Sequence, residues 1–278
     1  MDEPGYCSNF QECHPVGSRY PFGPQGHCPV REGGFGGAFR TLTRFPLPGR
    51  ECTRESRTLF WFPFVGVVLG LFSLGIALLP LSPFVRSSVI IATMAYLTRG
   101  FHLDGLCDFA DGFGGGWTKE ATLRIMRDSG VGAFAVITLV CTLLLQVFAI
   151  AELLAYLPLL LFVPALGRTM VVIAASLCSY AREGEGTASK LVCQSSARHM
   201  VGPLVQIVLF IASLFLFGSP SFLPACSAVL FALVMTGFLV RMSIRRLGGV
   251  TGDVLGAIEI LSESSAYLGA LILVAIKG

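Results

Sequence analysis

The chain has 278 residues, of which 54% are hydrophobic and only 13% are charged. Soluble domains carry about 25% charged residues, so this composition excludes an ordinary soluble enzyme and indicates a membrane protein. The formal net charge of +3 is too small to indicate a nucleic-acid partner, and we expect none. Nine cysteines are an odd number and several lie in apolar runs, so no disulfide framework is predicted.

The N-terminal segment, residues 1–37, is rich in glycine, proline and polar residues and has no periodic apolar pattern. It is predicted to be a flexible extension, and residues 38–278 to be a membrane-embedded domain. The extension contains five side chains of the zinc-binding types but no Cys-x-x-Cys pair, so a zinc site is not favoured there. These five are Cys7, Cys13, His14, His27 and Cys28.

Apolar runs alternate with polar segments over the rest of the chain. In residues 38–57 a few large apolar side chains alternate with arginines, which is typical of a segment at the cytoplasmic headgroup surface. Six runs that follow are predicted to cross the bilayer: 59–81, 85–97, 131–150, 153–180, 201–217 and 223–240. The last run, 266–276, is shorter than the minimum of about 17 residues, so its crossing stays open. The expected fold is all-α: a polytopic integral membrane helical bundle with about six to seven transmembrane helices and polar loops on the cytoplasmic side.

The distribution of basic residues predicts the orientation. If the N-terminus is cytoplasmic and every run crosses, the polar segments 99–127, 182–198 and 241–246 all fall on one side. Only Arg86 and Lys277 then lie near the opposite face, as the positive-inside rule requires. We therefore expect a protein of the cell inner membrane whose polar segments face the cytoplasm.

Three acids in the segment 99–129 indicate a metal site. Asp104, Asp108 and Asp111 are four and then three residues apart, so on a helix they fall within an arc of roughly 60°. Carboxylates packed this closely repel one another unless a cation neutralises them. Oxygen-only ligands favour Mg²⁺, which points to phosphate chemistry. The alternative, a solvated acidic helix face, is the common outcome for charges at this spacing.

Neighbouring residues suit phosphate binding. Gly112 and the run Gly114 to Gly116 allow backbone amides to approach an anion, and a helix starting near Thr118 would present further N–H groups. Asp253 follows a glycine-rich turn and is interpreted as a base, a further metal ligand or a helix N-cap. His102 projects about 160° away from Asp104 on a continuous helix and is interpreted as structural. Arg168 lies deep in an apolar run, so a partner within the bundle is expected.

Four motifs in order along the chain resemble the adenosylcobinamide-GDP ribazoletransferase family, also called cobalamin synthase. They are FRTLTRFPLP, then HLDGLCDFADGFGGGW with RIMRDSGVGAF, then SYAREGEG, and finally RLGGVTGDVLGAIEILSE. The similarity covers the chain from about Ala38 to the C-terminus, and the extension before it lies outside the resemblance.

The resemblance implies a Mg²⁺-dependent transfer at the membrane. The substrates would be adenosylcobinamide-GDP and α-ribazole or its 5′-phosphate, and the products adenosylcobalamin or its 5′-phosphate together with GMP. Asp104, Asp108 and Asp111 would hold Mg²⁺, with Asp108 and Asp253 acting in catalysis. Cationic side chains would contact the phosphates or the nucleotide, and these candidates are Arg127, Arg168, Arg182 and Lys190. The sequence leaves open whether the protein is a homo-oligomer.

Two alternatives come from other classes of protein. A CDP-alcohol phosphotransferase also uses aspartates on membrane helices, but its pattern places Ala-Arg three residues after Asp-Gly, whereas Asp104-Gly105 is followed by Leu106, Cys107 and Asp108. An ion-coupled transporter would place its ionisable groups near the bilayer midplane. Most such groups here lie at span ends on one side, which favours an enzyme.

Overall fold

The computed structural model describes residues 34–45, 47, 55–183 and 187–277. The chain divides into two units, Met1–Arg31 and Glu32–Gly278, and the first lies outside the described residues. The five candidate zinc ligands of the extension lie there as well. The described structure begins at Gly34, within the predicted extension, and the boundary at residue 38 stays a prediction.

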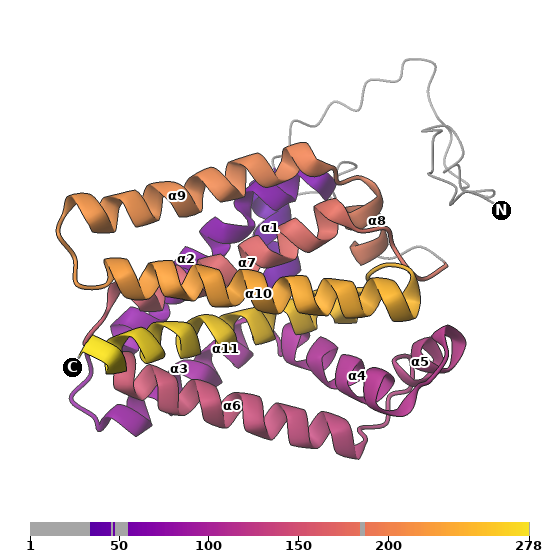
Figure 1. Cartoon of the computed structure of the whole chain (residues 1–278), viewed down its shortest axis with the longest axis horizontal. Coiled ribbons are helices and arrows are strands. Elements are labelled where there is room, and N and C mark those ends of the chain that lie inside the picture. The colour runs from indigo at the N-terminus through magenta and orange to yellow at the C-terminus, as the bar shows by residue number, and fades with distance from the viewer. Residues whose placement is uncertain (1–33, 46, 48–54, 184–186, 278) are drawn as a thin grey trace. The chain divides into compact units, whose positions relative to one another are not determined.

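The described part of Glu32–Gly278 is built from helices (Figure 1). In chain order they are α1 (Gly34–Leu42), η1 (Glu55–Trp61), α2 (Phe62–Ala77), α3 (Pro83–Leu97), α4 (Phe101–Gly115), α5 (Lys119–Ile125), α6 (Ala133–Leu153), α7 (Pro158–Leu177), α8 (Thr187–Cys193), η2 (Ala197–Met200), α9 (Val201–Leu216), α10 (Phe222–Leu247) and α11 (Gly252–Lys277). The only extended pairing among the described residues is a parallel bridge between Tyr180 and Val250.

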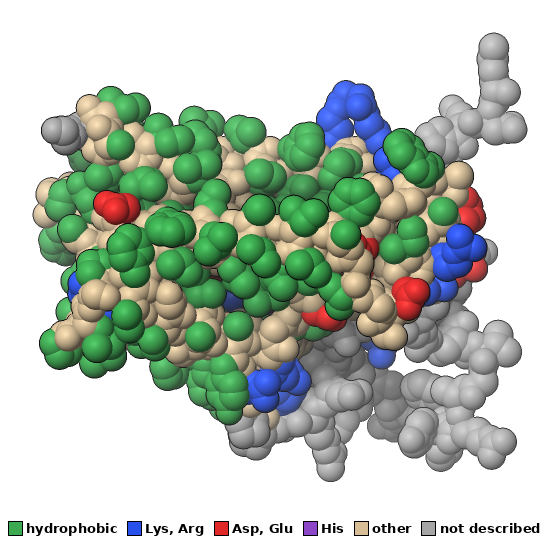
Figure 2. Space-filling model, turned by 90° about the horizontal axis from the view of Figure 1, so that it is seen from below, with side chains coloured by type: hydrophobic (Ala, Val, Ile, Leu, Met, Phe, Trp, Pro, Cys, Tyr) green, Lys and Arg blue, Asp and Glu red, His purple; other side chains and the backbone are tan. Residues whose placement is uncertain are grey.

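Six helical segments of the described chain are long and apolar enough to cross a membrane, and α3 is a shorter apolar helix. The six are Ser56–Ala77, Ala133–Leu153, Pro158–Leu177, Ala197–Leu216, Phe222–Leu247 and Gly252–Ile276. Apolar side chains cover most of the face seen in Figure 2, where charged side chains gather mainly toward one end. The prediction of a polytopic membrane helical bundle is confirmed, and the chain is an integral membrane protein.

The last helix is longer than its apolar run indicates. Helix α11 is continuous from Gly252 and includes the stretch that precedes the apolar residues 266–276. Its length qualifies it as a span, which the sequence left open. Hydropathy underestimates the length of α11 because it counts Glu259 and Glu263 as polar residues. Both side chains lie inside the bundle, where Glu259 is fully buried and Glu263 is largely buried. Helix α7 lies at the centre of the bundle, and most of its residues are buried.

Helices α3 and α4 follow one another with a break at Arg99 and Gly100, which have φ values of 60° and 66°. Arg99 is a non-glycine residue in the left-handed region, so surrounding contacts must stabilise it. Its guanidinium donates to two carbonyls at the end of α1, the nearer at 2.5 Å. Arg44 in return donates its backbone N–H to Leu97 O at 2.7 Å and its Nε to Tyr96 O at 2.5 Å. The ends of α1 and α3 therefore cap each other, and α4 starts in a new direction.

Helix α4 packs directly against α11. A Cβ on Gly105 would lie 3.0 Å from Asp253 O and 3.3 Å from Gly256 Cα. A Cβ on Gly256 would lie 3.2 Å from His102 O. A Cβ at either position would make a tighter contact than most real ones, so glycine favours this close approach of the two backbones. The contact brings the N-terminal turn of α11 beside the acidic face of α4.

Candidate active site

Three parts of the chain meet where α11 begins. Helix α4 supplies Asp104 and Asp108, α11 supplies Asp253, and the segment after α7 supplies Arg182. Backbone bonds hold this segment: Ala181 N donates to Val250 O, and Val250 N donates to a carbonyl after α7, each at 2.9 Å. As a result Arg182 Nη2 lies 2.6 Å from Asp253 Oδ2. The structure thus brings together two residues that the sequence placed in separate polar segments.

The acids interact electrostatically. Burial, the largest cause, and the charges of Asp253, Asp104 and Asp111 together raise the pKa of Asp108 from 3.8 to about 6, against the opposing charge of Arg182. Asp108 is half-buried and Asp104 is exposed. A carboxylate whose neighbours disfavour its charge is suited to binding a cation.

Asp111 lies on the same helix but contacts a different element. Its Oδ2 accepts the backbone N–H of Gly132 at 2.6 Å, and its Oδ1 accepts that of Ala135 at 2.9 Å. Asp111 therefore caps the N-terminus of α6, where Gly132 has no side chain to do so. Its assignment as a metal ligand stays a prediction. The sequence signal for this role was the lack of a capping side chain at Gly132, before the apolar run of α6.

The predicted cationic residues are dispersed. Arg182 lies beside the acids, whereas Arg127, after α5, and Lys190, on α8, are exposed. The sequence analysis missed Arg246, whose Nη1 donates to the carbonyl of Gly116 in the glycine-rich turn. Its guanidinium also lies 5.7 Å from the ring centroid of Phe113. The basic end of α10 therefore holds the turn between α4 and α5.

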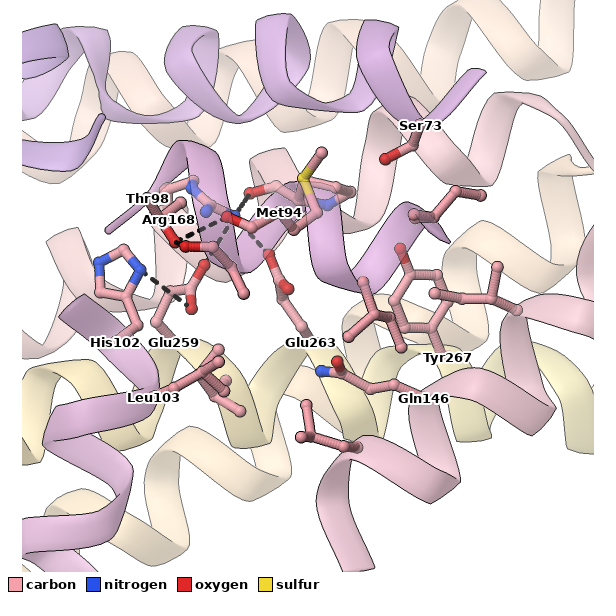
Figure 3. Close-up of a pocket in the computed structure, with 17 residues that line it drawn as sticks. Ser73, Met94, Thr98, His102, Leu103, Gln146, Arg168, Glu259, Glu263 and Tyr267 are labelled. Carbon is pink, nitrogen blue, oxygen red and sulfur yellow. Dashed lines mark hydrogen bonds and ion pairs between the residues drawn. The ribbon is translucent and has the colours of Figure 1, made fainter. Parts of the chain in front are cut away.

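Arg168 lies inside the bundle, away from solvent, with 3% of its surface exposed. Its Nη1 lies 2.6 Å from Glu259 Oε1 and also pairs with Glu263 (Figure 3). The expectation of a partner within the bundle is confirmed. The contact of Arg168 with substrate stays a prediction. Its positive charge is neutralised by Glu259 and Glu263.

His102 belongs to the same buried group. It is 4% exposed, and its Nδ1 lies 3.4 Å from Glu259 Oε2. Burial is the main cause that lowers the pKa of His102, although Glu259 opposes it. The cavity beside these residues has a volume of about 40 Å³. Pockets for small molecules usually have about 300–1,000 Å³, so this cavity is not the substrate site.

The donor set at the acidic face can be tested against Mg²⁺. Among the described residues, no three His, Cys, Asp or Glu side chains form a preformed metal centre. Mg²⁺ is usually bound by one or two carboxylates together with substrate phosphates and water, and it prefers oxygen ligands. Asp104, Asp108 and Asp253 offer only oxygen, and Asp108 carries a disfavoured charge. These residues fit a Mg²⁺ ion that shares its ligands with a diphosphate.

The comparison with known families agrees with the motifs in these elements. The family model described as cobalamin-5-phosphate synthase matches residues 34–271, which include every helix of the site. The chain belongs to the cobalamin-5-phosphate synthase family. Membership of this family does not support the CDP-alcohol phosphotransferase and transporter alternatives.

Curated members of the cobalamin-5-phosphate synthase family match nearly end to end. A protein of Chlorobium chlorochromatii named adenosylcobinamide-GDP ribazoletransferase is 41% identical over 249 residues, covering 87% of this chain and 97% of the relative. A protein of the same name from Chlorobium phaeobacteroides is 38% identical over 243 residues, with 85% and 96% covered. A Sinorhizobium protein, also so named, is 35% identical over 255 residues, with 84% and 93% covered. No solved structure matches the chain significantly.

The cap made by Asp111 predicts a stability difference within the acidic face. Asp111→Ala removes both acceptors at the start of α6 and should lower the melting temperature in detergent by about 2–6 °C, from a cap free energy of about 0.5–2 kcal/mol. Asp111→Asn keeps one acceptor and should fall between. The matched variant Asp104→Ala, at an exposed position, should melt within about 1 °C of the unmodified protein. Equal losses for Asp104→Ala and Asp111→Ala would contradict the cap.

The crowding around Asp108 predicts a pH-dependent gain in stability on neutralising it. A raised folded-state pKa means that the charged form costs stability above the unfolded value of about 3.8, and that the full cost is reached above about 6. With EDTA present, Asp108→Asn should raise the melting temperature by about 2 °C at pH 7.5, because partial exposure screens the repulsion. The gain should vanish near pH 4. The exposed Asp128→Asn should show no such dependence, and a gain equal at both pH values would contradict the crowding.

Proposed function

We propose that the protein is an adenosylcobinamide-GDP ribazoletransferase. It would join adenosylcobinamide-GDP and α-ribazole, or α-ribazole 5′-phosphate, to give adenosylcobalamin or its 5′-phosphate and GMP. The main support is the near full-length match to curated relatives of that name. The meeting of Asp108, Asp253 and Arg182 supports the same chemistry, since displacement at a diphosphate depends on positioning and neutralisation of charge.

In this proposal the ribose hydroxyl of the ribazole attacks the phosphorus linked to cobinamide. A new P–O bond forms, the bond to the bridging oxygen of the diphosphate breaks, and GMP leaves. Asp253 accepts the proton of the hydroxyl, and Arg182, 2.6 Å away, orients its carboxylate. Asp104 and Asp108 would hold Mg²⁺, which when bound would neutralise charge on the diphosphate.

The proposed location is the cell inner membrane, with the active site facing the cytoplasm. Basic residues support this orientation, since Arg182, Arg246 and Arg124 of α5 belong to the same end of the bundle as the acids. Arg86, at the start of α3, lies toward the other end, where its Nη1 bonds Ala77 O at 2.6 Å. Soluble nucleotide substrates would then reach the site without crossing the membrane.

The reaction can be measured directly. Purified protein in detergent with adenosylcobinamide-GDP, α-ribazole and MgCl₂ should release GMP, detected by liquid chromatography. EDTA should stop the release, and Asp108→Asn should slow it by about 100-fold or more, because a carboxylate ligand of the metal is lost. The control Glu120→Gln, an exposed acid on the neighbouring α5, should stay within about twofold of the unmodified protein. GMP release that is insensitive to EDTA and to Asp108→Asn would contradict the metal assignment. If no GMP is released at all, the proposed activity is wrong.

Labelling of single cysteines tests the orientation. In a background without other cysteines, cysteine placed at Lys119, Lys190 or Arg245 should react with an impermeant maleimide in inverted vesicles but not in intact spheroplasts. Leu81→Cys, in the turn between α2 and α3, should show the reverse. A mixed result among the first three positions would contradict the shared side.

A further inference from the structure

A network of buried charged groups links three helices of the bundle. It consists of His102 on α4, Arg168 on α7, and Glu259 and Glu263 on α11 (Figure 3). Glu259 is 0% exposed and contacts both His102 and Arg168, at 3.4 Å and 2.6 Å. Arg168 also donates to Pro164 O of its own helix at 2.9 Å, which fixes its direction.

This network lies next to the acidic site along the same two helices. His102 precedes Asp104 by two residues and Glu259 follows Asp253 by six. Between the two groups α4 and α11 touch through their backbones at Gly105 and Gly256. Two helices in backbone contact can still rotate or slide, so a second fixed contact is needed to set their register. The pair of His102 and Glu259 supplies it.

Stability alone is a weak reason for these charges. A buried ion pair is often no more stabilising than apolar residues of the same volume, because removing both charges from water is costly. The best-attested use of such pairs is to fix one register among several. In the low dielectric of the bundle, each broken contact would leave a charge or a polar atom unpaired, so displaced registers of α4 are strongly disfavoured.

We propose that the network of His102, Arg168, Glu259 and Glu263 is the positioning unit of the active site, which holds Asp104 and Asp108 of α4 opposite Asp253 of α11. His102 is a positioning residue: its Nδ1 lies 3.4 Å from Glu259 Oε2, and it touches no substrate. Arg168 holds Glu259 in place through its ion pair. This inference rests on the proposed transferase function, and it extends that function to residues outside the acidic face.

Variants of His102 test the proposal through GMP release by the purified full-length protein. His102→Leu keeps the bulk of the side chain but removes the Nδ1 contact with Glu259, and it should lower kcat by about 10-fold to 100-fold while KM changes by less than about threefold, since the acids are misplaced rather than lost. His102→Asn places an amide N–H near the Nδ1 position and should recover kcat to within about threefold. The control His199→Leu also removes a hydrogen-bonded imidazole, but on η2, and should leave both constants unchanged.

A double variant tests whether His102 acts through Glu259. If it does, His102→Leu combined with Glu259→Gln should lose no more activity than the worse single variant, whereas independent roles would add. Should His102→Leu fail to fold, the pair His102→Asn and His102→Gln replaces it, because the longer amide reaches the position of Nε2 instead and should not restore kcat.

The outcomes separate the two proposals. If the unmodified protein and His199→Leu release no GMP, the transferase function is wrong. The positioning role is wrong if both of these proteins release GMP and folded His102→Leu has the same kcat as they do. The same holds for His102→Gln if it is used in place of His102→Leu. The positioning role is also wrong if the kcat of His102→Asn does not exceed that of His102→Gln or His102→Leu. It is wrong as well if the losses of activity add in the double variant. A loss of kcat that His102→Asn restores supports it.

Discussion

The pairing of Arg168 with two acids is the interaction on which the arrangement of the bundle depends. A guanidinium in the centre of an apolar helix costs several kcal/mol unless it is neutralised. Its neutralisation requires α7 and α11 to lie side by side with Glu259 and Glu263 facing inward. It therefore fixes which face of α11 is buried, and with it the direction in which Asp253 points. The chemistry proposed at the bundle end depends on an electrostatic condition set inside it.

The two glycines at the crossing of α4 and α11 complete this arrangement. Because neither has a side chain, the backbones approach until Gly105 lies against Asp253 and Gly256. Asp104 and Asp108 on one helix and Asp253 on the other then face one another without flexible side chains having to reach across a gap. Short distances between helix backbones make the position of a functional group less dependent on rotamers. The site thus inherits its precision from main-chain packing.

Much of this could be predicted from the sequence. The length of apolar runs gave the spans, the spacing of the three aspartates gave their common helix, and the cost of Arg168 in an apolar run gave its need for a partner. The identity of that partner could not be found, because Glu259 and Glu263 precede the last apolar run and were not expected inside the bundle. The pairing of Arg182 with Asp253 was also hidden, since it depends on the bridge between Tyr180 and Val250. Spacing placed Asp111 with the other acids, but only the structure shows that the start of α6 uses its oxygens.

The mutual capping of α1 and α3 links the short first helix to the start of the acidic helix α4. Arg99 and Arg44 satisfy carbonyl groups on each other's helices, so removing α1 would leave Arg99 in a strained conformation without the acceptors that stabilise it. The first turn of α4 follows directly from that residue. A truncated protein that began at Ser56 would keep all of the spans that hydropathy identifies, yet it would lose the anchor from which its acidic helix departs.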